Sequence, residues 1–173
     1  MLPSPSPLPR LCSVFCALLA LTLAVPHEAA ARQAGNPVVT SGGGTSTLTS
    51  LVENPDGTLT IEAYQEGFLR GLGRFDGFFS YVAHIDYDTG ITQLIGSGMF
   101  VTPSGDELHL SVHLVQVGLD YPRPFTGMLT VQGGTGRFAR ASGLLTISGQ
   151  DDESLTDRFE LSGAISMRGQ GPK

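Results

Sequence analysis

The sequence predicts an all-β domain, an eight-stranded antiparallel up-and-down barrel. Apolar residues recur mostly at every second position after residue 46, and no segment keeps a helical three-to-four-residue period over about 11 residues. Turn signals rich in Gly, Pro, Asp and Asn separate the alternating runs about every 8 to 14 residues. Eight sequential strands favour closure, because a closed barrel has no exposed sheet edge. A two-sheet sandwich is the alternative with the same strand pattern.

The first 31 residues have the order of a secretory signal. One basic residue, Arg10, precedes the apolar, uncharged run Leu11–Val25, and an A-x-A pattern follows at Ala29 and Ala31. The run is shorter than the roughly 20 apolar residues that span a bilayer. We therefore expect a signal peptide over residues 1–31, a secreted or extracytoplasmic protein, and no stable membrane span after cleavage. An uncleaved anchor is the alternative.

Composition limits the function classes. Both cysteines, Cys12 and Cys16, lie in the signal, so the 142 residues left when 31 are removed from 173 must fold as one domain without a disulfide. The formal net charge is −6 and no basic run occurs, which argues against a nucleic-acid partner because phosphate binding needs clustered positive charge. No phosphate-binding or dinucleotide-binding glycine motif is complete, so we expect no cofactor.

The domain is predicted to divide into a flexible lead-in over residues 32–46, a barrel over 47–168 and a tail over 169–173. The lead-in is polar and Gly-rich, although its "PVVT" stretch could add to a sheet edge. The predicted strands are Thr45–Val52, Thr58–Gly71, Gly77–Asp86, Ile91–Val101, Glu107–Val117, Phe125–Gln132, Ser142–Gly149 and Arg158–Met167. They are separated in turn by NPDG, RFDG, DYDTG, TPSGD, GLDYPRP, GGTGRFARA and QDDESLTD.

The stretch "VQGGTGRFARASG" predicts a compact, wide turn before the seventh strand. Gly133, Gly134 and Gly136 permit backbone angles that are closed to other residues, and Thr135 can bond the local backbone. We expect Phe138 to fold back as a plug against one end of the barrel.

The same stretch, followed by "LLTISG" and "FELSGAIS", resembles the barrel group of allene oxide cyclases and dirigent proteins. That group carries a similar Gly-Gly-Thr-Gly-(Lys/Arg)-(Phe/Tyr) turn. The resemblance implies an eight-stranded antiparallel barrel, often a trimer, and an activity in which the barrel constrains a reactive intermediate and excludes water. Beyond the turn, the resemblance does not match any functional residue of that group to a position in this chain. Arg137 and Arg140 are expected at the rim as solvated charges, with binding of an anionic ligand group as the alternative.

Alternation also predicts which side chains line the barrel. On the second strand the inner face carries Ile61, Ala63, Gln65, Gly67 and Leu69. The third strand contributes Phe79, Tyr81, Ala83, Ile85 and Tyr87, and the fourth Ile91, Gln93, Ile95, Ser97, Met99 and Val101. Four of these are polar groups in an apolar lining, which is typical of a small-ligand site: Gln65, Tyr81, Gln93 and Ser97. The same set also describes a filled core.

Glu62 and Glu66 are the carboxylates to consider for catalysis. Apolar residues on the opposite face of their strand predict that both point to solvent. If the register were reversed, the pair would enter the apolar barrel, where burial and mutual repulsion would raise their pKa values and suit them to acid–base chemistry.

The histidines do not predict a metal site. His109 and His113 are four residues apart on a strand, which separates them by about 13 Å. We expect them, with His84, to be surface or subunit-interface residues.

Together these features predict a secreted barrel that binds a small apolar molecule. A cyclase, isomerase or dirigent-type template is one alternative, and a structural module with a filled barrel is the other. Whether the protein is an enzyme stays open at this stage.

Overall fold

The computed structural model describes residues 37–154 and 156–167, so the predicted signal (1–31) and tail (169–173) lie outside the described residues. Its strands are β1 (Pro37–Glu53), β2 (Leu59–Leu69), β3 (Gly73–Asp86), β4 (Ile91–Val101), β5 (Glu107–Val117), β6 (Arg123–Gly134), β7 (Ser142–Asp151) and β8 (Thr156–Ser166). One short 3-10 helix, η1 (Gly136–Phe138), connects β6 to β7. Within these ranges, no helix is long and apolar enough to cross a membrane.

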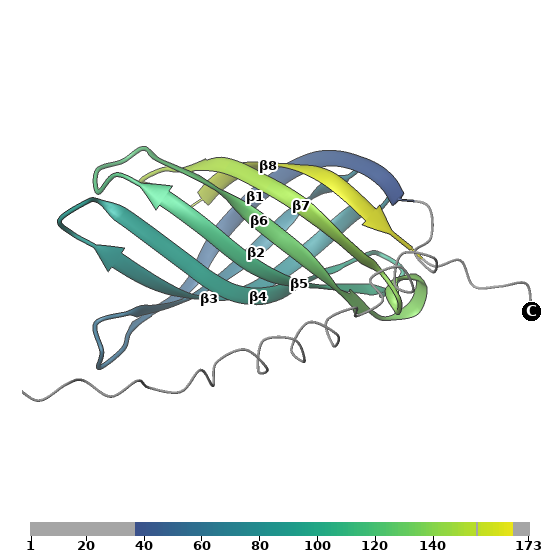
Figure 1. Ribbon diagram of the computed structural model, residues 1–173, viewed down its shortest axis with the longest axis horizontal. Coiled ribbons are helices and arrows are strands. Elements are labelled where there is room, and N and C mark those ends of the chain that lie inside the picture. The colour runs from purple at the N-terminus through teal and green to yellow at the C-terminus, as the bar shows by residue number, and fades with distance from the viewer. Residues whose placement is uncertain (1–36, 155, 168–173) are drawn as a thin grey trace, which may run out of the picture. The chain divides into compact units, whose positions relative to one another are not determined.

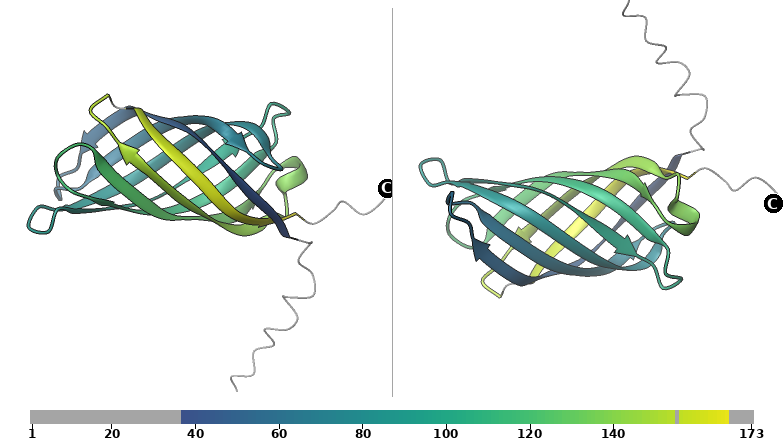
Figure 2. Two further views of the ribbon diagram at one scale, coloured as in Figure 1. Left: turned by 90° about the horizontal axis from the view of Figure 1, so that it is seen from above. Right: turned by 90° about the horizontal axis from the view of Figure 1, so that it is seen from below.

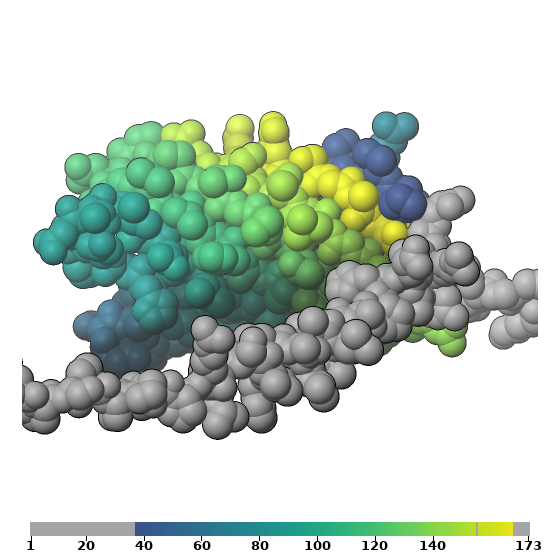
Figure 3. Space-filling model, in the orientation of Figure 1, coloured from purple at the N-terminus to yellow at the C-terminus, as the bar shows by residue number. Residues whose placement is uncertain are grey.

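The eight strands form a closed barrel in which each strand pairs antiparallel with the next and β8 pairs with β1 (Figures 1 and 2). This confirms the predicted up-and-down barrel over the sandwich alternative. Figure 3 shows the same side of the barrel as packed side chains, which fill the spaces that the ribbon leaves between strands. Six of the seven predicted connections fall at least partly between strands, because each carries the Gly, Asp or Pro residues that end a strand. The exception is RFDG, residues 74–77, which lies within β3, and the chain turns before it, at residues 70–72.

The prediction of a flexible lead-in over 32–46 is wrong from residue 37 onward. Strand β1 begins at Pro37, and Pro37–Thr47 pairs with β8 while Gly42–Glu53 pairs with β2. Thr40 is buried, and its hydroxyl donates to the backbone carbonyl of Arg70. The lead-in is ordered because it supplies the pairing that β8 and β2 would otherwise lack at the seam of the barrel.

One end of the barrel is filled, as the Gly-rich turn predicted. Phe138 on η1 is fully buried, and η1 lies at this end in both views of Figure 2. Thr135 exchanges hydrogen bonds with Glu107: its backbone N–H donates to the Glu107 carbonyl, and the Glu107 N–H donates to its hydroxyl, both at 2.9 Å. Gly136 has φ 50°, a left-handed conformation that favours glycine.

Arg137 is not the free rim charge that the sequence suggested. Its guanidinium donates to the backbone carbonyl of Leu72 at 2.8 Å, lies 3.7 Å from the Asp106 carboxylate, and sits 4.6 Å from the centre of the Phe138 ring. These contacts tie η1 to the β2–β3 and β4–β5 turns. The side chain thereby holds the plug in place.

An aromatic column fills the interior next to this plug. The ring centres of Phe75 and Phe100 are 4.0 Å apart, those of Phe100 and Phe79 are 5.5 Å apart, and Phe79 stacks on Tyr81 at 5.9 Å. Such contacts add to the burial energy of the rings. The column therefore runs from the plugged end toward the middle of the barrel.

Most predicted inner faces are confirmed, but the prediction for β4 is wrong. Thr92 and Phe100 are buried, whereas Gln93 and Ser97 are exposed. Both faces of this strand carry apolar residues, so alternation did not select one. The register decides it, because Gly98 lies opposite Phe79 on β3 and leaves room for that ring. Tyr87, which was expected inside, lies in the turn after β3 and is 73% exposed.

The corrected face of β4 gives a stability prediction. A Cβ at residue 98 would lie 2.2 Å from Cδ1 of Phe79 and 2.5 Å from the Phe78 carbonyl oxygen. We expect Gly98→Ala to lower the free energy of unfolding in urea by about 1–3 kcal/mol, the usual cost of overpacking. Ser97→Ala, on the outer face, is the matched control and should change it by less than about 0.5 kcal/mol. A larger loss of stability in Ser97→Ala than in Gly98→Ala would instead support the inner face that the sequence predicted for this strand.

Candidate functional site

The end of the barrel opposite the plug contains a cavity of about 260 Å³. Its wall is formed by all eight strands near the β1–β2, β3–β4, β5–β6 and β7–β8 connections. Leu51 and Tyr121 contribute to the wall and are 53% and 39% exposed, so the cavity opens to solvent at this end. The volume is slightly below the roughly 300–1,000 Å³ typical of small-molecule sites.

Most of the cavity wall is apolar. Its apolar side chains are Leu48, Leu51, Leu59, Ile61, Ala63, Ala83, Ile85, Leu94, Leu114, Phe125, Ile147 and Phe159. Alternation brings these residues inward from every strand. The cavity therefore presents apolar surface on all sides.

Gln65 and Tyr81 lie inside the cavity, where the sequence placed them. Gln65 is 4% and Tyr81 6% exposed, and the Gln65 side-chain N–H donates to the Tyr81 hydroxyl at 3.4 Å. Burial, and to a lesser degree the negative charge of Asp157, raises the pKa of Tyr81. Tyr81 is therefore a neutral phenol, and its hydroxyl marks the boundary between the aromatic column and the cavity.

The other two predicted ligand-binding residues do not lie in the cavity. Gln93 and Ser97 are on the outer face of β4, so their predicted place in the lining is wrong for the reason given above. Their inner-face neighbours Thr92 and Leu94 line the cavity instead.

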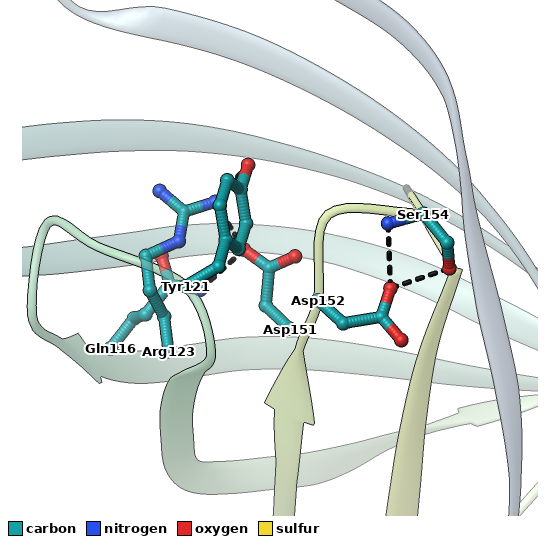
Figure 4. Close-up of polar contacts among 6 residues, drawn as sticks. All are labelled: Gln116, Tyr121, Arg123, Asp151, Asp152 and Ser154. Atoms are coloured by element: carbon teal, nitrogen blue, oxygen red, sulfur yellow. Dashed lines mark hydrogen bonds and ion pairs between the residues drawn. The ribbon is translucent and has the colours of Figure 1, made fainter.

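A polar cluster lies at the mouth of the cavity (Figure 4). Arg123 on β6 forms an ion pair with Asp151 on β7, and the Gln116 side-chain N–H donates to the same Asp151 oxygen at 2.9 Å. The Arg123 guanidinium also donates to the Tyr121 hydroxyl at 2.9 Å and lies 4.2 Å from the centre of that ring. The charge of Asp151 is therefore matched within the cluster.

A second carboxylate, Asp157 on β8, lies in the same wall and forms no ion pair with a described residue. Burial and the negative charge of the neighbouring Asp151 raise the pKa of Asp157 to about 7. A side-chain hydrogen bond with Asp151, which requires the proton, and the negative charge of Asp152 add to this effect, and Arg123 opposes it. Hydrogen bonds from Ser154, drawn in Figure 4, lower the pKa of Asp152, so its negative charge persists at neutral pH.

Sequence reasoning missed Gln116, Arg123, Asp151 and Asp157, although a signal for them exists. Each residue falls at a position where the alternation of its strand points inward. Asp157 stands two residues before the inward-facing Phe159, and Arg123 stands two residues before Phe125. Asp151 and Gln116 continue the inner faces of β7 and β5 in the same way. This signal was missed because charged residues were assumed to point outward. The assumption fails where a strand ends at an opening to solvent, since a charged side chain there can face inward and still reach water.

The remaining candidates lie outside the cavity. Glu62 and Glu66 are exposed on the outer face of β2, so the reversed register that would have made them an internal acid–base pair is excluded. His84, His109 and His113 are also exposed on the outside. Among residues 37–154 and 156–167, no group of three or more His, Cys, Asp or Glu side chains is arranged to hold a metal ion.

The pKa of Asp157 predicts how stability depends on pH. Since its folded pKa of about 7 exceeds the ordinary unfolded value of about 3.9, the folded state binds more protons between these values. Stability conferred by the protonated form is thus lost as pH rises toward 8. Between pH 5 and pH 8, we expect the wild type to lose about 1–2 kcal/mol more unfolding free energy than Asp157→Asn, after allowance for solvent screening. Glu160→Gln, an exposed neighbour on β8, is the control and should keep the wild-type slope; equal slopes in all three proteins would contradict the prediction.

Comparisons with known proteins identify the fold. No protein-family model and no curated protein matches the chain. A solved structure of a conserved protein of unknown function from Rhodopseudomonas palustris is similar, with a TM-score of 0.52 and 11% sequence identity over 75% of this chain and 93% of that chain. At this identity the similarity concerns the barrel alone, and the resemblance to allene oxide cyclases and dirigent proteins stays a prediction from the sequence.

Proposed function

We propose that this protein binds a small, mainly apolar molecule inside its barrel. The observation that carries the proposal is the division of the interior: the η1 end is filled by aromatic rings, and the other end holds an apolar cavity that opens to solvent. A few fixed polar groups in an apolar cavity are the usual form of a small-ligand site. A barrel that served only as a structural module would have no need of this hollow end.

The amino-terminal sequence supports a location for this activity. The signal-like order of residues 1–31 leads us to propose that the protein is exported and binds its ligand outside the cytoplasm.

Acid–base chemistry on the bound molecule is the second candidate function, as the resemblance to cyclases suggested. The observation in its favour is Asp157, because a carboxyl with a pKa of about 7 in an apolar site can take up and release a proton at neutral pH. In this proposal Asp157 replaces Glu62 and Glu66 as the candidate acid or base.

A cavity-filling variant tests the binding function. Ala83 lines the cavity and is 1% exposed, whereas its neighbour Val82 points outward. We expect toluene, followed by chemical-shift titration, to bind the wild type and Val82→Leu alike but to bind Ala83→Leu at least tenfold more weakly. Ile61→Phe, at another part of the wall, provides a second test if Ala83→Leu does not fold. Failure of toluene to bind the folded wild type would refute the proposed function.

Native mass spectrometry of the protein purified from its own host separates a carrier from an enzyme. We expect a defined extra mass that is released on gentle activation. If incubation with wild-type protein converts that molecule to a product, and incubation with Asp157→Asn does not, the protein is an enzyme. Release of the molecule unchanged from both proteins assigns a binding role.

A further inference from the structure

A row of three polar residues crosses the inner wall at the seam of the barrel. In the register of the sheet, Ser46 on β1 lies opposite Gln65 on β2 and opposite Asp157 on β8. All three line the cavity. Neighbouring strands are about 4.8 Å apart, so the backbones at Gln65 and Asp157 are about 10 Å apart with Ser46 between them. The side chains of all three residues extend from this row to the same cavity.

Two oxygen atoms of this row have unused hydrogen-bonding capacity. The side-chain oxygen Oε1 of Gln65 and the oxygen Oδ1 of Asp157 are buried, and neither has a partner among the described residues. The Gln65 side chain is more than nine-tenths buried, and its amide nitrogen is directed to Tyr81. Both free atoms are acceptors when Asp157 is ionised, so the matching group on a ligand is a hydrogen-bond donor.

The charges around the row select the kind of donor. The charged or titratable groups that face Asp157 are Asp151 and Asp152 from the β7 side, Arg123 from β6 and Tyr81 from β3. Arg123 is engaged by Asp151, and β1 and β2 contribute only the uncharged Ser46 and Gln65. The ionised Asp157 therefore has no cation of its own among these groups, and a cationic donor would neutralise it.

We propose that the cavity is selective for a small, mainly apolar primary amine in its protonated form, with the ammonium group donating hydrogen bonds to Gln65 Oε1 and Asp157 Oδ1. This inference rests on the proposed binding function and names its ligand class. A neutral alcohol would offer one donor and leave the charge unmatched, and a carboxylate would meet two acceptors and a like charge.

Proton release accompanies binding in this arrangement. Asp157 is largely protonated below pH 7, and the ammonium ion favours its ionised form. Binding below pH 7 therefore expels a proton from Asp157 into solvent, and affinity for the amine rises with pH until Asp157 is ionised. Affinity for a neutral alcohol lacks this dependence.

Matched benzyl compounds test the inference by calorimetry on the protein purified from its host. Benzylamine, benzyl alcohol and benzoate have bodies of similar size that differ in the polar group. We expect benzylamine at pH 8 to bind at least tenfold tighter than benzyl alcohol, with no detectable benzoate binding. At pH 6 the preference for the amine should fall at least fivefold, and the heat of binding should depend on the ionisation enthalpy of the buffer.

Variants separate this inference from the binding function. Asp157→Asn should abolish the preference for benzylamine over benzyl alcohol, and Gln65→Leu should weaken binding of the amine more than binding of the alcohol. Glu160→Gln is the control and should behave as wild type. If the wild type binds benzyl alcohol as tightly as benzylamine at pH 8, or if Asp157→Asn keeps the preference, the amine inference is overturned and the cavity's binding function stands. If the folded wild type binds neither compound nor toluene, the binding function itself fails.

Discussion

Strand β1 hydrogen-bonds to β8 along its first part and to β2 along the rest, with an overlap over Gly42–Thr47 where it is paired on both sides. The other features of the barrel depend on this closure. It removes both sheet edges, and it fixes the register between the two ends of the chain. The register then places Ser46 between Gln65 and Asp157, residues that are far apart in the sequence. The polar row in the cavity is thus a direct result of closing the sheet.

The interior of the barrel is divided along its length by side-chain size. Toward the plugged end, glycines on the inner faces lie against aromatic rings: Gly98 beside Phe79 and Gly67 beside Phe75. Toward the mouth, the wall is built mainly from aliphatic side chains and alanine, which are too small to meet in the centre. An eight-stranded barrel is just wide enough for either outcome. The distribution of rings and glycines therefore decides which half is solid and which is hollow.

The two carboxylates at the mouth differ in their partners, and this difference sets the charge and the protonation state of the site. Asp151 has an ion-pair partner and a hydrogen-bond donor, whereas the ionised Asp157 is repelled by Asp151 and is only weakly stabilised by Arg123. Burial of an unmatched carboxylate is unfavourable, and protonation relieves it in the absence of a cation. The same feature connects the stability of the fold with the protonation state of the site, and the proposed preference for an amine rests on it.

The sequence by itself determined the number of strands, the inner faces of β2 and most of β3, the plug at Phe138 and the internal positions of Gln65 and Tyr81. These properties are local, because alternation and turn chemistry act within about ten residues. The tertiary structure alone decided the inner face of β4, where both faces are apolar and only pairing with Phe79 selects one. It also decided that the Gly-rich segment after residue 36 is a strand, because its partners come from β2 and β8. The cluster of Arg123, Asp151 and Asp157 belongs to the same category: each residue is an ordinary charge near a strand end, and only closure of the barrel brings the three to one cavity.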